Sequence, residues 1–281
     1  MATFAFSLDI IDMTDVNDSG DGLWGRPDDC EFSYVVKVPG TTEQVSLAAV
    51  QDREICSGTP AFPSHGHCVW DAALLLADYL QTRAVEAAQS TSKVNGGDFF
   101  QFRGKKVVEL GAGVGLVGMA LAVLGARVVL TDQEYALPLL IKNVAVNFCD
   151  RDDGEASNSR EVMAPTVEEC QWEEPFKTGT CLASWRKSTD VVVFSDVLYH
   201  ASAFLLLIET LHELASPTTD VFFSFETRNA SIEASFLQQL AATFDVEEVS
   251  RKDNPQVFAS FEYPDELFIY HARLKARSNE N

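Results

Sequence analysis

The sequence predicts an α/β fold with a doubly wound, seven-stranded and mostly parallel sheet, and three observations lead to it. Strand-like apolar runs alternate with helical patterns from residue 106 onward, which is typical of β–α–β units. The segment 107–116, VVELGAGVGL, joins a short strand to a helix through glycines at alternate positions. A second strand-like run, residues 127–131, ends at Asp132. Together these features form the first half of a nucleotide-binding sheet.

The elements before this sheet are a hairpin and a helix. Two β-prone runs, residues 32–38 and 44–50, flank a Pro-Gly-Thr-Thr turn and predict a hairpin. Residues 69–83 have the apolar spacing of a buried helix. The polar segment 89–98 then forms a loop that leads to the sheet.

The elements of the sheet follow in alternation. The predicted strands are residues 106–110, 127–131, 161–166, 190–195, 221–225, 244–249 and 267–274. The predicted helices are residues 114–124, 134–147, 202–215 and 231–243. The third strand is the least typical, because Pro165 cannot donate a ladder hydrogen bond.

Three parts of the chain are expected on this basis. Residues 1–30 form an acidic, flexible N-terminus, residues 31–100 form the hairpin and helix extension, and residues 101–275 form the sheet domain. The charged segment 150–160 is expected to be a surface insertion within that domain.

The charge of the chain limits its partners. A formal net charge of −21 argues against nucleic acid, because phosphate binding requires a basic face. A basic protein or peptide is a compatible partner through long-range attraction, although solubility alone is a simpler explanation of the charge.

The cysteines and the apolar runs indicate the compartment. Six cysteines are scattered without a C-x-x-C pair, which favours a reducing compartment over a disulfide framework. The cluster His65-Gly66-His67-Cys68 lacks a distant second pair of ligands, so no metal site is expected. No apolar run approaches the roughly 20 residues of a membrane span. We therefore expect a cytoplasmic monomer, with a nuclear location as the alternative, and no membrane contact.

The glycine frame separates two candidate cofactors. Gly113-x-Gly115-x-x-Gly118 matches the dinucleotide fingerprint, but in that fingerprint the first glycine follows the strand directly. Here Gly111 has that place. Glu109, just before the turn, would repel a pyrophosphate, whereas it suits a ligand with an ammonium and a sulfonium. This comparison favours S-adenosylmethionine over NAD(P).

Several further motifs resemble one enzyme family. VWDAA at residues 69–73, ELGAGVGLVG at 109–118, Thr131-Asp132, Gln171-Trp172 and SDVLY at 195–199 occur in its order. The chain is identified by them as a member of methyltransferase family 16, the seven-β-strand protein lysine methyltransferases outside the SET class. The resemblance covers roughly residues 32 to 274 and implies a Rossmann-like class I fold.

The resemblance implies a set of cofactor-binding residues around one crevice. They are Trp70, Glu109, Gly111, Ala112, Gly113, Asp132, Trp172 and Ser195. Physical arguments support these roles: glycines let the backbone approach the methionine part closely, and Asp132 can accept from the ribose hydroxyls. Trp172 can stack on the adenine, with a core tryptophan as the alternative. The product would be S-adenosylhomocysteine.

Asp196 and Tyr199, in the pattern D-x-x-Y, are the candidate catalytic residues. A lysine must be neutral to attack a methyl group, and its free pKa is about 10.4. A carboxylate favours the charged form, so Asp196 is expected to recognise the ammonium and aim the amine. Tyr199 would flank the amine with its ring. The alternative is a helix-capping aspartate with a packed tyrosine.

The sequence therefore predicts a protein-lysine N-methyltransferase that uses S-adenosylmethionine and acts on a non-histone protein, as the resemblance to enzymes of chaperones and ATPases implies. The segment Glu226-Thr-Arg228 resembles one that relatives place near the acceptor groove. Two alternatives stay open: a methyltransferase for a small molecule or another side chain such as histidine, and a scaffold that binds the cofactor without turnover.

Overall fold

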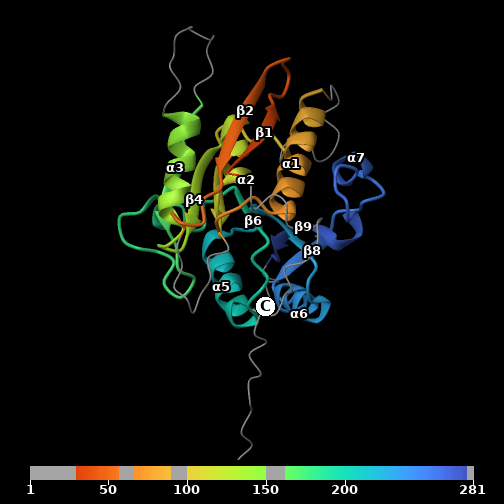
Figure 1. The fold of residues 1–281 in the computed structure, drawn as a ribbon. Helices are drawn as coiled ribbons and strands as arrows, with labels where there is room; N and C mark the ends of the chain where they lie inside the picture. The colour runs from red at the N-terminus through yellow and green to blue at the C-terminus, as the bar shows by residue number, and fades with distance from the viewer. Residues whose placement is uncertain (1–29, 57–65, 90–99, 150–161, 277–281) are drawn as a thin grey trace, which may run out of the picture.

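The computed structural model describes residues 30–56, 66–89, 100–149 and 162–276, and a seven-stranded sheet organises them (Figure 1). Its strand order is β5-β4-β3-β6-β7-β9-β8. The pairs from β5 to β7 are all parallel, and β9 runs antiparallel to both β7 and β8. The predicted doubly wound, mostly parallel sheet of seven strands is confirmed.

The strands begin and end close to the predicted positions. They are β1 (Glu31–Lys37), β2 (Gln44–Val50), β3 (Lys106–Leu110), β4 (Arg127–Asp132), β5 (Thr166–Glu169), β6 (Val191–Ser195), β7 (Asp220–Glu226), β8 (Phe244–Glu248) and β9 (Leu267–Leu274). The helices are α1 (Asp71–Gln89), α2 (Leu116–Val123), α3 (Leu137–Phe148), α4 (Cys181–Ser184), α5 (Phe204–Leu214), α6 (Ala230–Leu240) and α7 (Pro255–Phe258). Two 3₁₀ turns are η2 (Ala201–Ala203) and η3 (Pro264–Glu266).

The third strand of the large sheet is the clearest difference from the prediction. We expected it at residues 161–166, but β5 starts at Thr166 and pairs with β4 through Val167 and Glu168. The reason is Pro165, which has no N–H for the ladder and therefore precedes the strand. The expected acidic N-terminus up to residue 29 and the whole of the 150–160 insertion lie outside the described residues.

Two apolar cores cover the two faces of the sheet, because successive strand residues point to opposite faces. Val107 and Phe222 belong to the core that α1, α2, α3 and the hairpin share. Their neighbours Val108 and Phe223 belong to the core under α5 and α6. In Figure 1 the first group of helices lies in the upper half of the view and the second in the lower half. This arrangement confirms helices on both faces.

The hairpin is attached to α3 by two buried asparagines. Asn147 accepts from Ala48 N at 2.8 Å and donates to Ala48 O at 2.7 Å. Asn143 accepts from Val50 N at 2.7 Å and donates to Val50 O at 3.1 Å. Strand β2, which pairs with β1 on one side, thus has side-chain partners on the other. The described helices include none long and apolar enough to cross a membrane.

Candidate active site

The crevice predicted from the sequence would lie where four neighbouring parallel strands end, and we call this edge of the sheet the crevice. Strands β4, β3, β6 and β7 are buried along almost their whole length, and each leads into a partly exposed residue. These residues are Asp132, Gly111, Ser195 and Glu226. Carboxyl ends of parallel strands share one edge of the sheet, which is where such sheets bind ligands. We call the ends of β3 and β4 the cofactor half and the ends of β6 and β7, with the start of α1, the acceptor half.

The turn after β3 requires glycine on steric grounds. Gly111 and Gly113 have φ values of 64° and 54°, a conformation that side chains rarely adopt. A Cβ on Gly111 would lie 2.7 Å from a methyl group of Val197, and one on Gly113 would lie 3.5 Å from Cα of Gly66. Ala112, which is buried, fixes the turn by donating its N–H to Thr131 O at 2.9 Å. Neighbouring chain segments thus approach this backbone closely, as the glycines permit.

Asp132 joins the glycine turn to the next strand. Its Oδ2 accepts from Gly113 N at 2.7 Å, and its Oδ1 accepts from Gln133 N at 2.7 Å. Burial raises the pKa of this carboxyl above its usual value, against the two backbone donors. Each carboxylate oxygen can accept a second hydrogen bond, and the residue is partly exposed. These two acceptor oxygens fit the two hydroxyls of a ribose, and the ribose contact stays a prediction.

Glu109 lies deeper than its predicted role suggests. The residue is 1% exposed, and its Oε2 accepts from Gly118 N in the first turn of α2 at 2.7 Å. Burial raises its pKa to about 8, with a smaller contribution from the charge of Asp132. At neutral pH the group is therefore mostly protonated. Its attraction for a cofactor ammonium stays a prediction, whereas its contact with Gly118 is a structural role that the motif did not reveal.

Asp196 occupies a strained backbone position directly after β6. Its φ is 56°, which is uncommon for a residue with a side chain, and its N–H donates to Ser224 O at 2.9 Å. The side chain is 5% exposed. Strain of this kind costs on the order of 1–3 kcal/mol and concentrates at functional sites. Asp196 is thus held at the edge of the sheet by its neighbours on β7.

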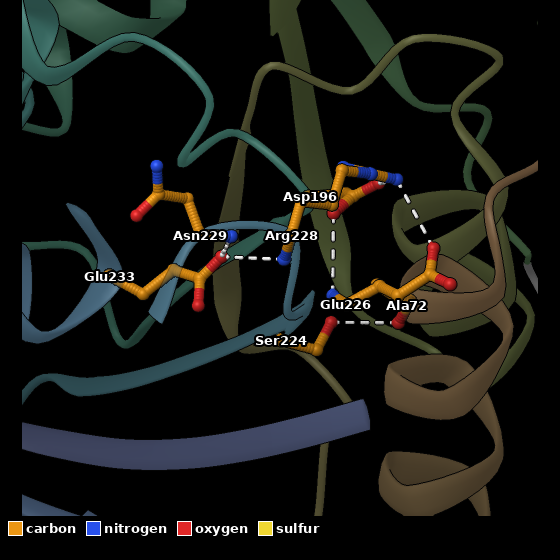
Figure 2. A network of polar contacts seen from close by, with 7 residues as sticks. All are labelled: Ala72, Asp196, Ser224, Glu226, Arg228, Asn229 and Glu233. Atoms are coloured by element: carbon orange, nitrogen blue, oxygen red, sulfur yellow. Dashed lines mark hydrogen bonds and ion pairs between the residues drawn. The ribbon is translucent and has the colours of Figure 1, made fainter. Parts of the chain in front are cut away.

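Arg228 is the partner of Asp196. Nη1 donates to Oδ1 at 3.0 Å and Nη2 donates to Oδ2 at 2.7 Å, so the pair is bidentate. Figure 2 shows the guanidinium directly against the carboxylate. The guanidinium lies 5.1 Å from the ring centroid of Trp70, just before α1. Trp70 thus lies beside the Asp196–Arg228 pair, and its predicted contact with the cofactor stays a prediction. Sequence reasoning placed Arg228 near the acceptor groove but did not pair it with Asp196, which is 32 residues away.

Tyr199 links the two halves electrostatically. Partial burial, together with the negative charges of Asp132 and Asp196, raises its pKa to about 12. The residue is 41% exposed, and its ring meets that of His200 at 4.7 Å. A phenol that stays protonated at neutral pH between the two predicted binding halves can donate a hydrogen bond or flank an amine.

Ser195 and Trp172 complete the set of predicted residues. Ser195 pairs with Ser224 of β7 and is partly exposed at the edge of the crevice. Trp172 is half-buried against the core under α5 and α6. It lies two residues after Cys170, whose N–H donates to Asp132 O at the end of β4 at 2.9 Å. Stacking on an adenine stays a prediction.

The described edge fits a cationic adenosine cofactor better than a pyrophosphate. Asp132, Asp196 and Glu226 are acidic, and Arg228 is the basic residue bound among them. A surplus of negative charge attracts cations and repels phosphates. The backbone turn, the acceptor capacity of Asp132 and this charge therefore agree with the predicted cofactor.

Comparisons with known proteins identify the family. A family model described as lysine methyltransferase, family 16 of the methyltransferases, matches residues 57–243. EEF1A lysine methyltransferase 3 of Xenopus tropicalis is 30% identical over 188 residues, which cover 67% of this chain and 70% of that protein. Protein N-lysine methyltransferase METTL21A of Danio rerio is 34% identical over 181 residues, which cover 64% of this chain and 69% of that protein.

A solved structure, the 16S rRNA N2 G1207 methyltransferase of T. thermophilus, is 16% identical with a TM-score of 0.48, over 88% of this chain and 51% of that one.

The family model and the two relatives show that the chain belongs to the lysine methyltransferase family, as its motifs predicted. It is an enzyme that transfers methyl groups to lysine.

Proposed function

We propose that this enzyme transfers a methyl group from S-adenosylmethionine to the Nε atom of a lysine on a non-histone protein, with Asp196 recognising the lysine. The observation that carries the proposal is the position of the Asp196 carboxylate, which stands on the same sheet edge as the glycine turn. The relative from Xenopus tropicalis is named for EEF1A, so EEF1A is the first acceptor to test, with chaperones and ATPases next. We also propose that the enzyme acts in the cytoplasm, which its cysteine content supports, and that it acts as a monomer.

The roles of the residues follow from their contacts. S-adenosylmethionine, when bound, supplies a methyl group on a positively charged sulfur. The Gly111–Gly113 backbone and Ser195 would line its methionine part, Asp132 would accept from its ribose, and Trp172 would cover its adenine. Asp196 and Tyr199 orient the acceptor amine, and alignment of this kind is a major source of rate acceleration.

The test is transfer of tritium from labelled S-adenosylmethionine to bacterially produced EEF1A and to a lysate of cells that lack the enzyme. We expect a labelled protein whose digest contains Nε-methyl-lysine. The variant Asp196→Asn should lose at least about 100-fold in rate, since it removes the charge that recognises the ammonium.

A matched control is Asp220→Asn. Asp220 is also a buried carboxylate, 4% exposed, and it accepts from Arg273 Nε at 2.7 Å. It begins β7, whereas Asp196 is level with the end of that strand, so its loss should leave labelling intact. Label on histidine or on a small molecule would overturn the lysine proposal. Labelling by Asp196→Asn equal to that by the wild type would show that Asp196 does not recognise the acceptor.

A further inference from the structure

Asp196 can bind an acceptor amine only if its pairing with Arg228 leaves an acceptor position unused. Besides the two guanidinium contacts, Oδ1 of Asp196 accepts from Glu226 N at 3.4 Å. Oδ2 accepts one hydrogen bond from the described residues, from Arg228 at 2.7 Å. Because a carboxylate oxygen offers about two acceptor positions, Oδ2 can still bind an incoming amine while Arg228 stays in place.

The structure holds Arg228 from several directions. Its Nη2 contacts Glu226 Oε2 at 3.2 Å, and its guanidinium covers the Trp70 ring at 5.1 Å. Its backbone N–H donates to Glu233 Oε1 at 2.8 Å, as Figure 2 shows. Glu233 also binds Asn229 N at 2.9 Å and so fixes the loop between β7 and α6. A side chain with this many partners is part of the site and not a plug that an acceptor displaces.

The charge of the pair bears on the state of the acceptor lysine. A lysine arrives as an ammonium and reacts as a neutral amine. Two carboxylates, Asp196 and Glu226, would hold its proton strongly, since negative charges favour the ammonium. Arg228 adds one positive charge to these two negative ones. The cluster therefore attracts a cation less strongly than its carboxylates alone would, while both carboxylates remain hydrogen-bonded.

We propose that Arg228 is a retained counter-charge that offsets Asp196, so that the acceptor ammonium can release its proton to water while Oδ2 of Asp196 aims the resulting amine. This inference rests on the proposed function. In the reaction, the N–H bond of the ammonium breaks and the proton passes to water. The nitrogen lone pair then forms the N–CH₃ bond as the S–CH₃ bond breaks. The electron pair of that bond stays on sulfur, which becomes a neutral thioether beside an N-methylammonium product.

Other ionisable groups surround this cluster and remain constant in the test. They come from the segment before and at the start of α1, from the loop after β6, from β7 and α6, and from the turn before β9. They are Cys68, Asp71, Tyr199, Glu226, Glu233 and Glu266.

The experiment is the pH profile of kcat at saturating acceptor, because kcat reports the ionisations of the bound complex. Purified EEF1A serves as the acceptor or, if the lysate labels a different protein, that protein. In Arg228→Gln we expect the alkaline rise of kcat to move upward by about one pH unit or more, with about tenfold loss at pH 7 and recovery near pH 9. Arg228→Lys keeps the charge and should keep the wild-type profile.

Arg83→Gln is the matched control. Arg83 also covers an aromatic ring, that of Phe100 at 5.0 Å, and it pairs with Glu86 at 2.6 Å, but it lies in the second half of α1, away from the end of that helix that Trp70 precedes. It should leave the profile unchanged. Calorimetric affinity for S-adenosylmethionine, measured for each variant, separates a change at the acceptor from a loss of fold.

A second arm combines Asp196→Asn with Arg228→Gln. The single change Asp196→Asn leaves a guanidinium facing the incoming ammonium, so the double variant should label at least about fivefold faster than that single variant. A uniform rate loss in Arg228→Gln without a shift in the profile would overturn the inference and leave Arg228 a structural role. Absence of lysine label from the wild type would overturn the proposed function and the inference with it.

Discussion

In the cofactor half of the crevice the carboxyl groups bind backbone N–H groups, whereas in the acceptor half the Asp196 carboxylate binds mainly another side chain. Asp132 holds Gly113 N, and Glu109 holds Gly118 N, both at 2.7 Å and both within the glycine motif and its next strand. Asp196 instead pairs with Arg228 from the loop after β7. The first half is thus built into the backbone of the motif, and the second depends on which residues the fold brings together.

This difference predicts whether a substitution in each half affects stability or catalysis. A substitution in the cofactor half alters the packing of the turn and the helix, so we expect effects on stability. A substitution in the acceptor half alters charge at the surface of the crevice, so we expect effects on catalysis. The predictions below, together with those for Asp196 and Arg228, test this division from the largest effect to the smallest.

The largest stability effect should come from Glu109→Gln, as a function of pH. Burial raises the pKa of Glu109 from 4.5 to about 8 in the folded protein. Between these values the unfolded state releases the proton and the folded state keeps it, so stability falls as pH rises and levels off above about 8. The variant lacks this loss, on the order of 5 kcal/mol.

Urea unfolding of the wild type and of Glu109→Gln, from pH 4.5 to pH 9, measures this difference. The free energy of unfolding of the wild type should decline relative to that of the variant across the range. Two curves that stay parallel would show that Glu109 ionises as easily in the fold as in water.

Gly118→Ala should destabilise the protein by about 3 kcal/mol, through overpacking and a displaced buried acceptor. The added Cβ would lie 2.2 Å from Leu130 Cδ2 and 2.6 Å from Glu109 Oε2. Gly40→Ala provides the comparison, because that glycine has φ 73° and nothing within 4 Å of the added carbon. It should cost only about 1 kcal/mol of backbone strain. Equal denaturation midpoints for the two variants would contradict the steric argument.

Trp172→Leu should give the smallest effect, a loss of cofactor affinity of about tenfold, which corresponds to one stacking contact. Calorimetric titration with S-adenosylmethionine measures it. The Michaelis constant for the acceptor protein should stay within about twofold of the wild type, since the proposed contact of Trp172 is with the cofactor and not with the acceptor. A change in the Michaelis constant for the acceptor protein alone would show that Trp172 contacts the acceptor and not the cofactor.

Local patterns predicted the backbone of the molecule well. Alternation of strands and helices led to the sheet, and the glycine spacing led to the Gly111–Gly113 turn, because both depend on residues close in the chain. The start of β5 was wrong by about five residues. There a β-prone run continued across Pro165, and the missing N–H decided where pairing begins.

The acceptor half was predictable only in part, for a physical reason. The D-x-x-Y pattern indicated Asp196, and a resemblance indicated the region of Arg228. Pairing the two required knowledge that the loops after β6 and β7 adjoin, which is a property of strand order. The position of Trp70 beneath Arg228 also depends on how α1 packs against β7, where Ser224 Oγ donates to Ala72 O at 2.7 Å (Figure 2).

The asparagines of α3 supply hydrogen-bond partners to the edge of β2 that no described strand pairs with. An edge strand with unpaired N–H and C=O groups is a template for pairing with another chain. Asn143 and Asn147 bind both backbone groups of Val50 and Ala48, so they act as a substitute strand along β2. Deleting the hairpin would remove the partners of both Oδ1 atoms and expose the surrounding apolar surface, although Asn143 Nδ2 would keep Val114 O and Asn147 Nδ2 would keep Asn143 O. A truncated enzyme that begins after the hairpin should therefore self-associate and aggregate.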